Sequence, residues 1–253
     1  MSRVLATLKF VGTAYHGSQI QANALTIQEV FQLALEGATG ERPDVKLCSR
    51  TDSGVHAEKF CISFDREGVT PLGKLVLAIN AHLPRDVRVI SARPVSDDFH
   101  ARYSARAKRY IYKVYNSRVL DPFFHGRAAQ FVTHIDERKL DGIAKAFVGT
   151  HDFAAFCSIK TDAESTVRTV CDFSVSRDGE LVIFSVCADG FLYNMVRIMA
   201  GTLMNAARGK LTRDDIERAL ETGVRTNRFP TAPACGLYLA DVIYDEETLA
   251  VPE

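Results

Sequence analysis

The 253-residue sequence contains no tryptophan, carries no net charge and has no long apolar run. Its longest apolar stretches, such as residues 181–186, are far shorter than the roughly 20 residues that a membrane-spanning helix needs. The N-terminal residues also lack the apolar core of a signal peptide. These absences argue against a membrane protein and against a secreted protein, and we therefore expect a cytoplasmic one.

Closely spaced cysteines are also missing. The six cysteines form no Cys-x-x-Cys motif and no tight cluster with histidine, which zinc sites require, so we expect no metal. Several of them lie in apolar stretches such as Phe60-Cys61-Ile62. Because free cysteine is commonly buried, we expect small, reduced thiols packed inside the protein, in a reducing compartment.

What the chain does have is an alternation of strand and helix patterns along its whole length, with 47% hydrophobic residues. Thr26 with Glu29 forms a capping box that should begin a helix, and Asp178-Gly179 between two alternating runs indicates a hairpin. Strands are predicted over residues 4–10, 45–48, 60–64, 87–90, 109–115, 170–176, 181–188 and 237–244. Helices are predicted from Thr26 to the glycines at 37 and 40, and over residues 72–83, 136–148, 192–207 and 212–220.

Strands and helices follow one another in a similar order in the two parts of the chain, although no sequence repeat is visible. We predict an α+β fold of two similar α/β halves, of the RRM or ferredoxin-like kind, over residues 1–100 and 101–253. The halves should share a central, mostly antiparallel sheet, with a cleft between them.

Positive charge is concentrated although the total is zero. Residues 101–118 include six basic residues and no acidic one: Arg102, Arg106, Lys108, Arg109, Lys113 and Arg118. Local charge sets the local potential, so this segment could be a surface that binds nucleic-acid phosphates. A solvated strand face explains the same pattern, and the residues alone leave both interpretations open.

A polar loop is predicted over residues 49–59, between two predicted strands, and its stretch 49–57 places one carboxylate, Asp52, among small residues. Catalytic groups concentrate in loops that rigid elements hold. Asp52 could act as a nucleophile or a base, and Arg50 could bind phosphate. The alternative is a turn in which Asp52 bonds only to its own backbone.

The sequence Arg-Thr-Asp-Ser-Gly-Val-His at residues 50–56 resembles the catalytic loop of the tRNA pseudouridine synthase A (TruA) family, whose pattern is Arg-Thr-Asp-(Ala/Ser)-Gly-Val-His. Four further segments resemble that family in its own order, and together they span nearly the whole chain. They are residues 98–105, 108–116, 191–201 and 236–239.

The resemblance implies a role for each of five residues. Asp52 would be the catalytic aspartate, and Arg50 beside it would help to position RNA. Tyr110 would stack on the target base, and Leu237 would form part of the apolar floor of the uracil pocket. Arg197 would pair with the aspartate, keeping it ionised and oriented.

The resemblance also implies a reaction and its partners. The enzyme would isomerise uridine to pseudouridine in the anticodon stem-loop of tRNA, at positions 38, 39 and 40, as a homodimer without a cofactor. A base that leaves its stack can be held on an aromatic face such as Tyr110. The alternatives are a non-catalytic RNA-binding module and a small-molecule enzyme with Asp52 as base. A loop carboxylate, which repels phosphate, disfavours a pure binding module.

Simpler explanations exist for several of these residues. Tyr110 alternates with Tyr112 and could be core, and either Leu237 or Leu239 could form the pocket floor. His56 and His100 could contact RNA, although a lone histidine is more often structural. Arg197, by contrast, lies in an otherwise apolar helical segment, where a charge is rarely buried without a partner.

One departure from the family pattern concerns the first loop. The family usually carries Gly-Trp-Gln-x-Gln, whereas residues 17–21 here read Gly-Ser-Gln-Ile-Gln. The glutamines are retained and the aromatic residue is not. This puts an RNA-contacting role of the first loop in doubt, but leaves the expected chemistry unaffected.

Overall fold

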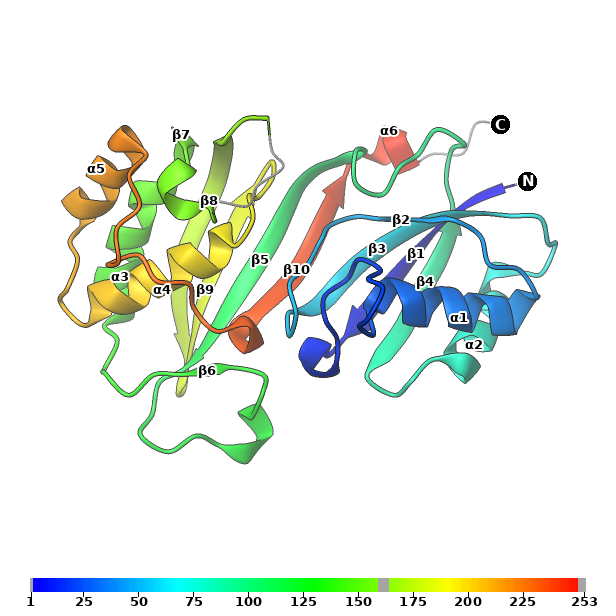
Figure 1. Cartoon of the computed structure of the whole chain (residues 1–253), viewed down its shortest axis with the longest axis horizontal. Helices are drawn as coiled ribbons and strands as arrows, with labels where there is room; N and C mark the ends of the chain where they lie inside the picture. The colour runs from blue at the N-terminus through cyan, green and yellow to red at the C-terminus, as the bar shows by residue number, and fades with distance from the viewer. Residues whose placement is uncertain (1, 159–163, 250–253) are drawn as a thin grey trace. The chain divides into compact units, whose positions relative to one another are not determined.

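The computed structural model describes residues 2–158 and 164–249. The chain forms two compact units. Unit 1 comprises Met1–Arg106 with Leu239–Glu253, and unit 2 comprises Ala107–Tyr238. Figure 1 shows that both units combine helices with strands.

Unit 1 is built on a sheet in which β1 lies between β3 and β4 and is antiparallel to both. Val4 of β1 is paired with Phe64 of β3 on one side and with Pro94 of β4 on the other. β3 also pairs with β2 and with β10. The elements are β1 (Ser2–Phe10), α1 (Ile27–Thr39), β2 (Val45–Leu47), β3 (His56–Arg66), α2 (Leu72–His82), β4 (Val87–Pro94), β10 (Leu237–Tyr244) and α6 (Glu246–Leu249).

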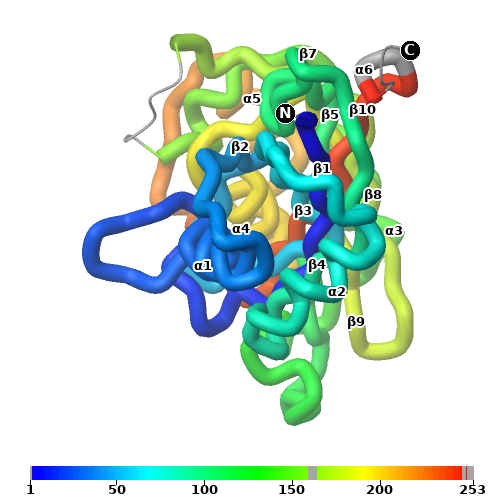
Figure 2. Tube along the Cα trace, turned by 90° about the vertical axis from the view of Figure 1, so that its right-hand side faces the viewer, coloured from blue at the N-terminus to red at the C-terminus, as the bar shows by residue number. Residues whose placement is uncertain are grey.

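Helices α1 and α2 pack together and against this sheet (Figure 2). α1 begins at the Thr26 cap, whose side chain accepts a hydrogen bond from the Glu29 N–H, and this confirms the predicted helix start. From α1, the buried Phe31 meets Phe64 of β3, with ring centroids 5.8 Å apart. The amide side chain of Asn80 on α2 makes two hydrogen bonds with the backbone of Val89 on β4.

Unit 2 contains strands in the order β5-β9-β8-β7, with antiparallel pairing, and a short β6 parallel to β5. α3 and α4 pack on each other, and α3 also contacts β8. The elements are β5 (Ala105–Tyr115), β6 (Ala129–Gln130), α3 (Glu137–Ala144), β7 (Gly149–Asp152), β8 (Val167–Asp178), β9 (Leu181–Ala188), α4 (Met195–Ala207) and α5 (Arg213–Thr222). The first two residues of β5 belong to unit 1, and the first two of β10 to unit 2.

The core of unit 2 centres on fully buried phenylalanines. Phe147 contacts Phe156 and Phe173, with centroids 5.0 and 5.6 Å apart, and Phe156 contacts Phe229 at 5.2 Å. Burial of large aromatic side chains is among the largest contributions that single residues make to a core. Unit 2 therefore has an apolar core of its own.

The predicted fold class, α+β with mostly antiparallel strands, is confirmed, and the predicted elements are present with shifted ends. Helix α1 runs through Gly37 and ends at Gly40, whose φ of 80° suits glycine. α3 ends at Ala144, and a 3₁₀ turn over Lys145–Phe147 follows it. The division of roles between residues 1–100 and 101–253 stays a prediction.

The cysteines only partly match the expectation of buried thiols. Cys48, Cys61, Cys157 and Cys187 are buried, whereas Cys235 is intermediate. Cys171 is exposed, so the prediction was wrong there. The reason is an irregularity of β8, where the register against β9 shifts between Val170 and Asp172 and leaves Cys171 outside the regular pairing, while Val170 and Phe173 are both buried.

A glycine in α4 is expected to be required for packing. A Cβ atom at Gly201 would lie 2.1 Å from the carbonyl oxygen of Pro230, so the backbone would have to move. We expect Gly201→Ala to lower the free energy of unfolding by about 1–3 kcal/mol, as overpacking does. Gly142→Ala in α3 is the matched control, since a Cβ there would meet nothing within 4 Å and alanine favours helix. Equal urea midpoints for wild type and Gly201→Ala would contradict this packing.

Candidate active site

Asp52 lies in the loop between β2 and β3 of unit 1, which we call the Asp loop and define as residues 48–55. The carbonyl oxygen of Asp52 accepts a hydrogen bond from the Val55 N–H at 3.2 Å, which closes a tight turn. Gly54 within this turn has φ of 79°, a conformation that glycine adopts without strain. The Asp52 side chain is half-buried, and Arg50 is exposed.

The Asp loop contacts the first loop, residues 12–21, through its backbone. The carbonyl oxygen of Tyr15 accepts hydrogen bonds from the Gly54 N–H and the Ser53 hydroxyl, at 3.2 and 3.3 Å. The Tyr15 hydroxyl donates to Asp86 at 2.7 Å. Burial raises the pKa of Tyr15 above its usual range, and the hydrogen bond to Asp86 raises it further. Tyr15 is therefore a neutral, structural side chain beneath the Asp loop.

The two candidate histidines take structural positions. His56 is fully buried, and its Nδ1 accepts a hydrogen bond from the Gly12 N–H at 2.9 Å. His100 Nδ1 accepts from the Arg102 N–H at 3.1 Å, and burial lowers the pKa of His100. Each imidazole thus satisfies a backbone donor of its own unit, which supports the structural interpretation over RNA contact.

Tyr110 lies on β5 in unit 2 and is 5% exposed. Its ring meets the ring of Phe191 edge to face, with centroids 5.1 Å apart. Tyr112, two residues on, is fully buried, and its hydroxyl donates to the Pro233 carbonyl at 2.8 Å. Tyr112 has an aromatic neighbour as well, since its ring stacks on that of Phe184 with centroids 6.2 Å apart. Both tyrosines are therefore buried in the aromatic packing of unit 2.

Arg197 lies in the first turn of α4 and is held by oxygen atoms of unit 2. Its Nε donates to the Ala232 carbonyl and its Nη1 to Asn194 Oδ1, each at 2.9 Å. Asn194 precedes the helix with φ of 61°, and its own amide donates to Ser158 Oγ at 2.9 Å. Among the described residues Asn194 is the one non-glycine with positive φ. Such strained positions concentrate at functional sites.

Asn194 was not predicted as a site residue from the sequence, where it appears only as part of the segment 191–201 that resembles the family. The signal that could have found it is its place at the start of a helix, since asparagine tolerates the left-handed conformation better than most residues. The αL conformation also explains why α4 begins at Met195 rather than at residue 192.

Leu237 begins β10 and is 6% exposed, while Leu239 is fully buried. Just before them, a Cβ at Gly236 would lie 2.6 Å from the Tyr112 ring. Glycine at 236 therefore lets the chain approach Tyr112 closely. Burial does not decide between Leu237 and Leu239, so the choice of Leu237 as pocket floor stays a prediction.

The predicted site residues are divided between the two units. Asp52 and Arg50 belong to unit 1, and Tyr110, Arg197 and Leu237 belong to unit 2.

The basic segment 101–118 is less cationic than its composition suggests. Arg106 forms an ion pair with Asp245. Arg109 is paired with Asp172 at 3.1 Å, and that hydrogen bond raises the pKa of Arg109. These carboxylates are 139 and 63 residues away in sequence, so local composition could not show the compensation.

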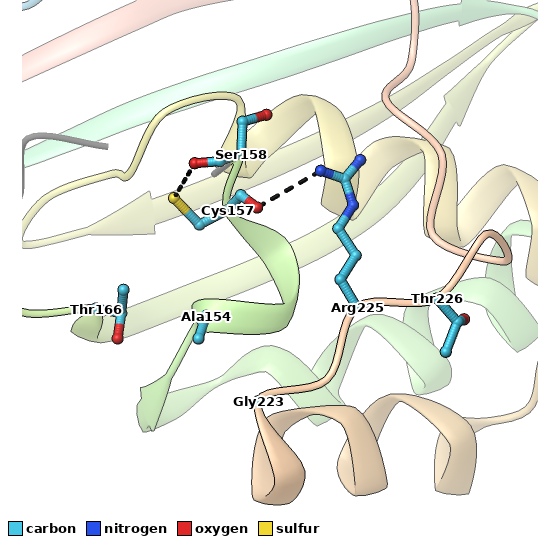
Figure 3. Close-up of a pocket in the computed structure, with 7 residues that line it drawn as sticks. All are labelled: Ala154, Cys157, Ser158, Thr166, Gly223, Arg225 and Thr226. Atoms are coloured by element: carbon cyan, nitrogen blue, oxygen red, sulfur yellow. Dashed lines mark hydrogen bonds between the residues drawn. The ribbon is translucent and has the colours of Figure 1, made fainter. Parts of the chain in front are cut away.

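Unit 2 contains a pocket, whose lining residues are shown in Figure 3. Its wall includes Cys157, Ser158 and Arg225, and Arg225 Nη1 donates to the Cys157 carbonyl at 3.5 Å. Ser158 is the residue whose hydroxyl accepts from Asn194. Hydrogen bonds therefore connect Arg197 through Asn194 to Ser158, which lines this pocket.

Over residues 2–158 and 164–249, no helix is both long and apolar enough to span a membrane. In the same residues, no group of three or more histidine, cysteine or acidic side chains is placed to hold a metal ion.

Comparison with known proteins gives a consistent picture. The family described as "tRNA pseudouridine synthase" matches residues 6–104 and 143–245, ranges that include Asp52, Arg197 and Leu237 but not Tyr110. The "tRNA pseudouridine synthase A" of Acetivibrio thermocellus is 41% identical over 244 residues, which cover 96% of this chain and 100% of that protein. The protein of that name from Bacillus licheniformis is 41% identical over 245 residues, covering 96% and 99% of the two chains. A chain in "Crystal Structure of a Cbf5-Nop10-Gar1 Complex" matches 97% of this chain and 52% of its own length with 12% identity and a TM-score of 0.40, too low to carry an argument.

Proposed function

Since this chain belongs to the tRNA pseudouridine synthase family, we propose that it isomerises uridine to pseudouridine in tRNA, with Asp52 as the nucleophile. The target is assigned to positions 38–40 of the anticodon stem-loop. The observation that carries the proposal is the match to proteins named "tRNA pseudouridine synthase A" over 96% of the chain. The family match over residues 6–104 includes the Asp loop.

The reaction needs no net change in redox state. The N1–C1′ bond breaks, the uracil turns and a C5–C1′ bond forms, while C5 loses a proton and N1 ends with one. A carboxylate can bond to C1′ as the N1–C1′ bond breaks and leave again as C5 bonds to C1′, while the pocket holds the detached uracil, and this is the role that we assign to Asp52. The turn at Asp52–Val55 supports it, because a nucleophile must be held in a defined position.

The remaining residues are assigned from unit 2. We propose that Tyr110 stacks on the extruded uracil, with Leu237 as the apolar floor beneath it. A base on an aromatic face is worth about 1–3 kcal/mol of binding. Arg197 pairs with Asp52, and Arg50 contacts the RNA backbone. The guanidinium of Arg197 is suited to this role because Ala232 and Asn194 fix its orientation beforehand.

Chemical labelling of pseudouridine in tRNA tests the activity and its position together. tRNA is compared between cells that make the protein and cells that lack it. We expect labelled positions 38, 39 and 40 in the first sample and unlabelled uridines there in the second. The same labelling in both samples, or a change confined to another part of the tRNA, would contradict the assigned target. Protein that binds tRNA without changing any uridine would indicate a binding module.

We further predict a homodimer in which each chain supplies basic surface to one tRNA. The basic segment is short, and two of its six arginines and lysines are paired with Asp245 and Asp172. tRNA presents phosphates over a longer span, and affinity for nucleic acid depends on the number of phosphates neutralised. Light scattering should give the mass of two chains. A monomer with full activity at the same concentration would refute the dimer.

A further inference from the structure

The first loop lies against the Asp loop, and Ser18 is at their contact. Ser18 is fully buried, although it occupies the position at which the resembling family usually carries tryptophan. Its hydroxyl accepts a hydrogen bond from the Thr51 N–H at 2.8 Å and donates to the Ser49 carbonyl at 3.2 Å. Its own N–H donates to the Thr51 carbonyl at 3.1 Å. One serine thus makes three hydrogen bonds to the residues that directly precede Asp52.

Ser18 is in turn held by helix α1. The Ser18 carbonyl accepts a hydrogen bond from the Gln28 N–H at 3.0 Å, and the neighbouring Gly17 carbonyl accepts one from the Ile27 N–H at 3.2 Å. Both donors lie in the first turn of α1, where backbone N–H groups have no partner within the helix. The first loop therefore links a rigid helix to the Asp loop.

Two glycines permit this approach. A Cβ at Gly12 would lie 1.8 Å from the Val55 carbonyl oxygen, and a Cβ at Gly17 would lie 2.4 Å from that of Thr51. Gly17 also has φ of 90°, which disfavours a side chain there. The backbones of the two loops are thus in direct contact on both sides of Asp52.

We infer that Ser18 is a positioning residue for Asp52, acting through Thr51 and Ser49. This inference rests on the proposed function. The Ser18 hydroxyl fixes the position and direction of the backbone just before Asp52 through its hydrogen bonds to Thr51 and Ser49. The first turn of α1 in turn fixes the backbone of Ser18. At position 18, where the resembling family usually carries tryptophan, the serine of this chain therefore supports the Asp loop and does not contact RNA. Small displacements of a reacting group matter, since about 1 Å of misplacement can cost on the order of a hundredfold in rate.

The test compares Ser18→Ala with a matched variant, Ser63→Ala. Ser63 is 1% exposed, lies in β3 of the same unit, and its hydroxyl accepts from the Ala101 N–H at 3.1 Å. Each substitution removes one buried hydroxyl and leaves one backbone N–H without that partner. Comparable losses of folding stability are therefore expected from both. A merely structural role predicts the same kinetics for both variants as well.

Our expectation is that Ser18→Ala lowers kcat by about 10- to 100-fold with KM for tRNA within about twofold, whereas Ser63→Ala keeps both near wild type. Ser18→Cys, which retains a weak donor and acceptor of similar size, should fall between Ser18→Ala and wild type. If Ser18→Ala does not fold, Ser18→Cys replaces it in the comparison with Ser63→Ala.

Wild-type kcat in Ser18→Ala, or equal losses in the Ser18 and Ser63 variants, would overturn the inference and leave the proposed function standing. To identify this outcome, wild type and Asp52→Ala are run in the same assay. An active wild type and an inactive Asp52→Ala protein show that the proposed function holds although the role of Ser18 does not. A wild-type protein that leaves tRNA uridines unchanged would instead overturn the proposed function and, with it, the role of Ser18.

Discussion

Replacing Asp52 with alanine is expected to abolish isomerisation while tRNA binding stays close to wild type. Asp52 is the only carboxylate in the Asp loop, so its replacement leaves the loop without the carboxylate to which we assign the covalent bond. Affinity should come mainly from phosphate contacts by basic residues, so removal of one carboxylate should not weaken it. The loss should therefore lie in kcat and not in the dissociation constant.

Single-turnover assays and filter binding on one tRNA measure the two quantities separately. Asp52→Asn keeps the shape of the side chain and should be as inactive as Asp52→Ala. Asp97→Ala, which removes an exposed carboxylate elsewhere in unit 1, serves as the control and should be fully active. Turnover by Asp52→Ala above background would exclude Asp52 as the nucleophile.

Replacing Arg197 with methionine is expected to cause the second-largest loss. Methionine keeps much of the bulk but removes both the charge and the hydrogen bonds to Ala232 and Asn194. If Arg197 pairs with Asp52 and bound tRNA removes water from the pair, loss of one partner costs on the order of 3 kcal/mol. At about 1.4 kcal/mol per factor of ten, kcat should fall about a hundredfold or more. Arg197→Lys should recover activity only partly, because lysine lacks the planar, two-pronged donor.

Steady-state rates for the two Arg197 variants test the kinetic effect. A double-mutant cycle with Asp52→Asn and Arg197→Met, measured by urea unfolding, tests the pairing without reference to activity. Interacting residues typically deviate from additivity by at least about 0.5 kcal/mol. A near-wild-type rate for Arg197→Met, or additive effects in the cycle, would show that Arg197 does not hold the nucleophile.

Much of the fold could be predicted because the relevant information is local. The Thr26 cap, the hairpin around Gly179 and the strand at 237–244 each depend on residues close in sequence, and the structure has all three. The ends of helices are predicted less accurately where a single residue departs from the helical conformation. Asn194 in the left-handed region delays the start of α4, and no periodicity of apolar residues reports that.

The surroundings of the candidate site could not be predicted, because they depend on contacts between distant residues. Ser18 and Thr51 are 33 residues apart, and His56 and Gly12 are 44 apart. The partner of Arg109 lies on another strand, 63 residues away. Asp52 was already a candidate from its polar loop, and Arg197 from its apolar segment. The roles of Asp52, Tyr110 and Arg197 came from the resemblance to a family, whereas the contacts that hold them came from the structure.

The most direct test of the central claim uses purified protein and one unmodified tRNA transcript. Wild type and Asp52→Ala are each incubated with the transcript, and pseudouridine is located by chemical labelling. A second transcript has cytidine at positions 38, 39 and 40. We predict pseudouridine in the anticodon stem-loop of the first transcript with wild type, and none with Asp52→Ala or in the second transcript. Pseudouridine formed by Asp52→Ala, or formed elsewhere in both transcripts, would contradict the account.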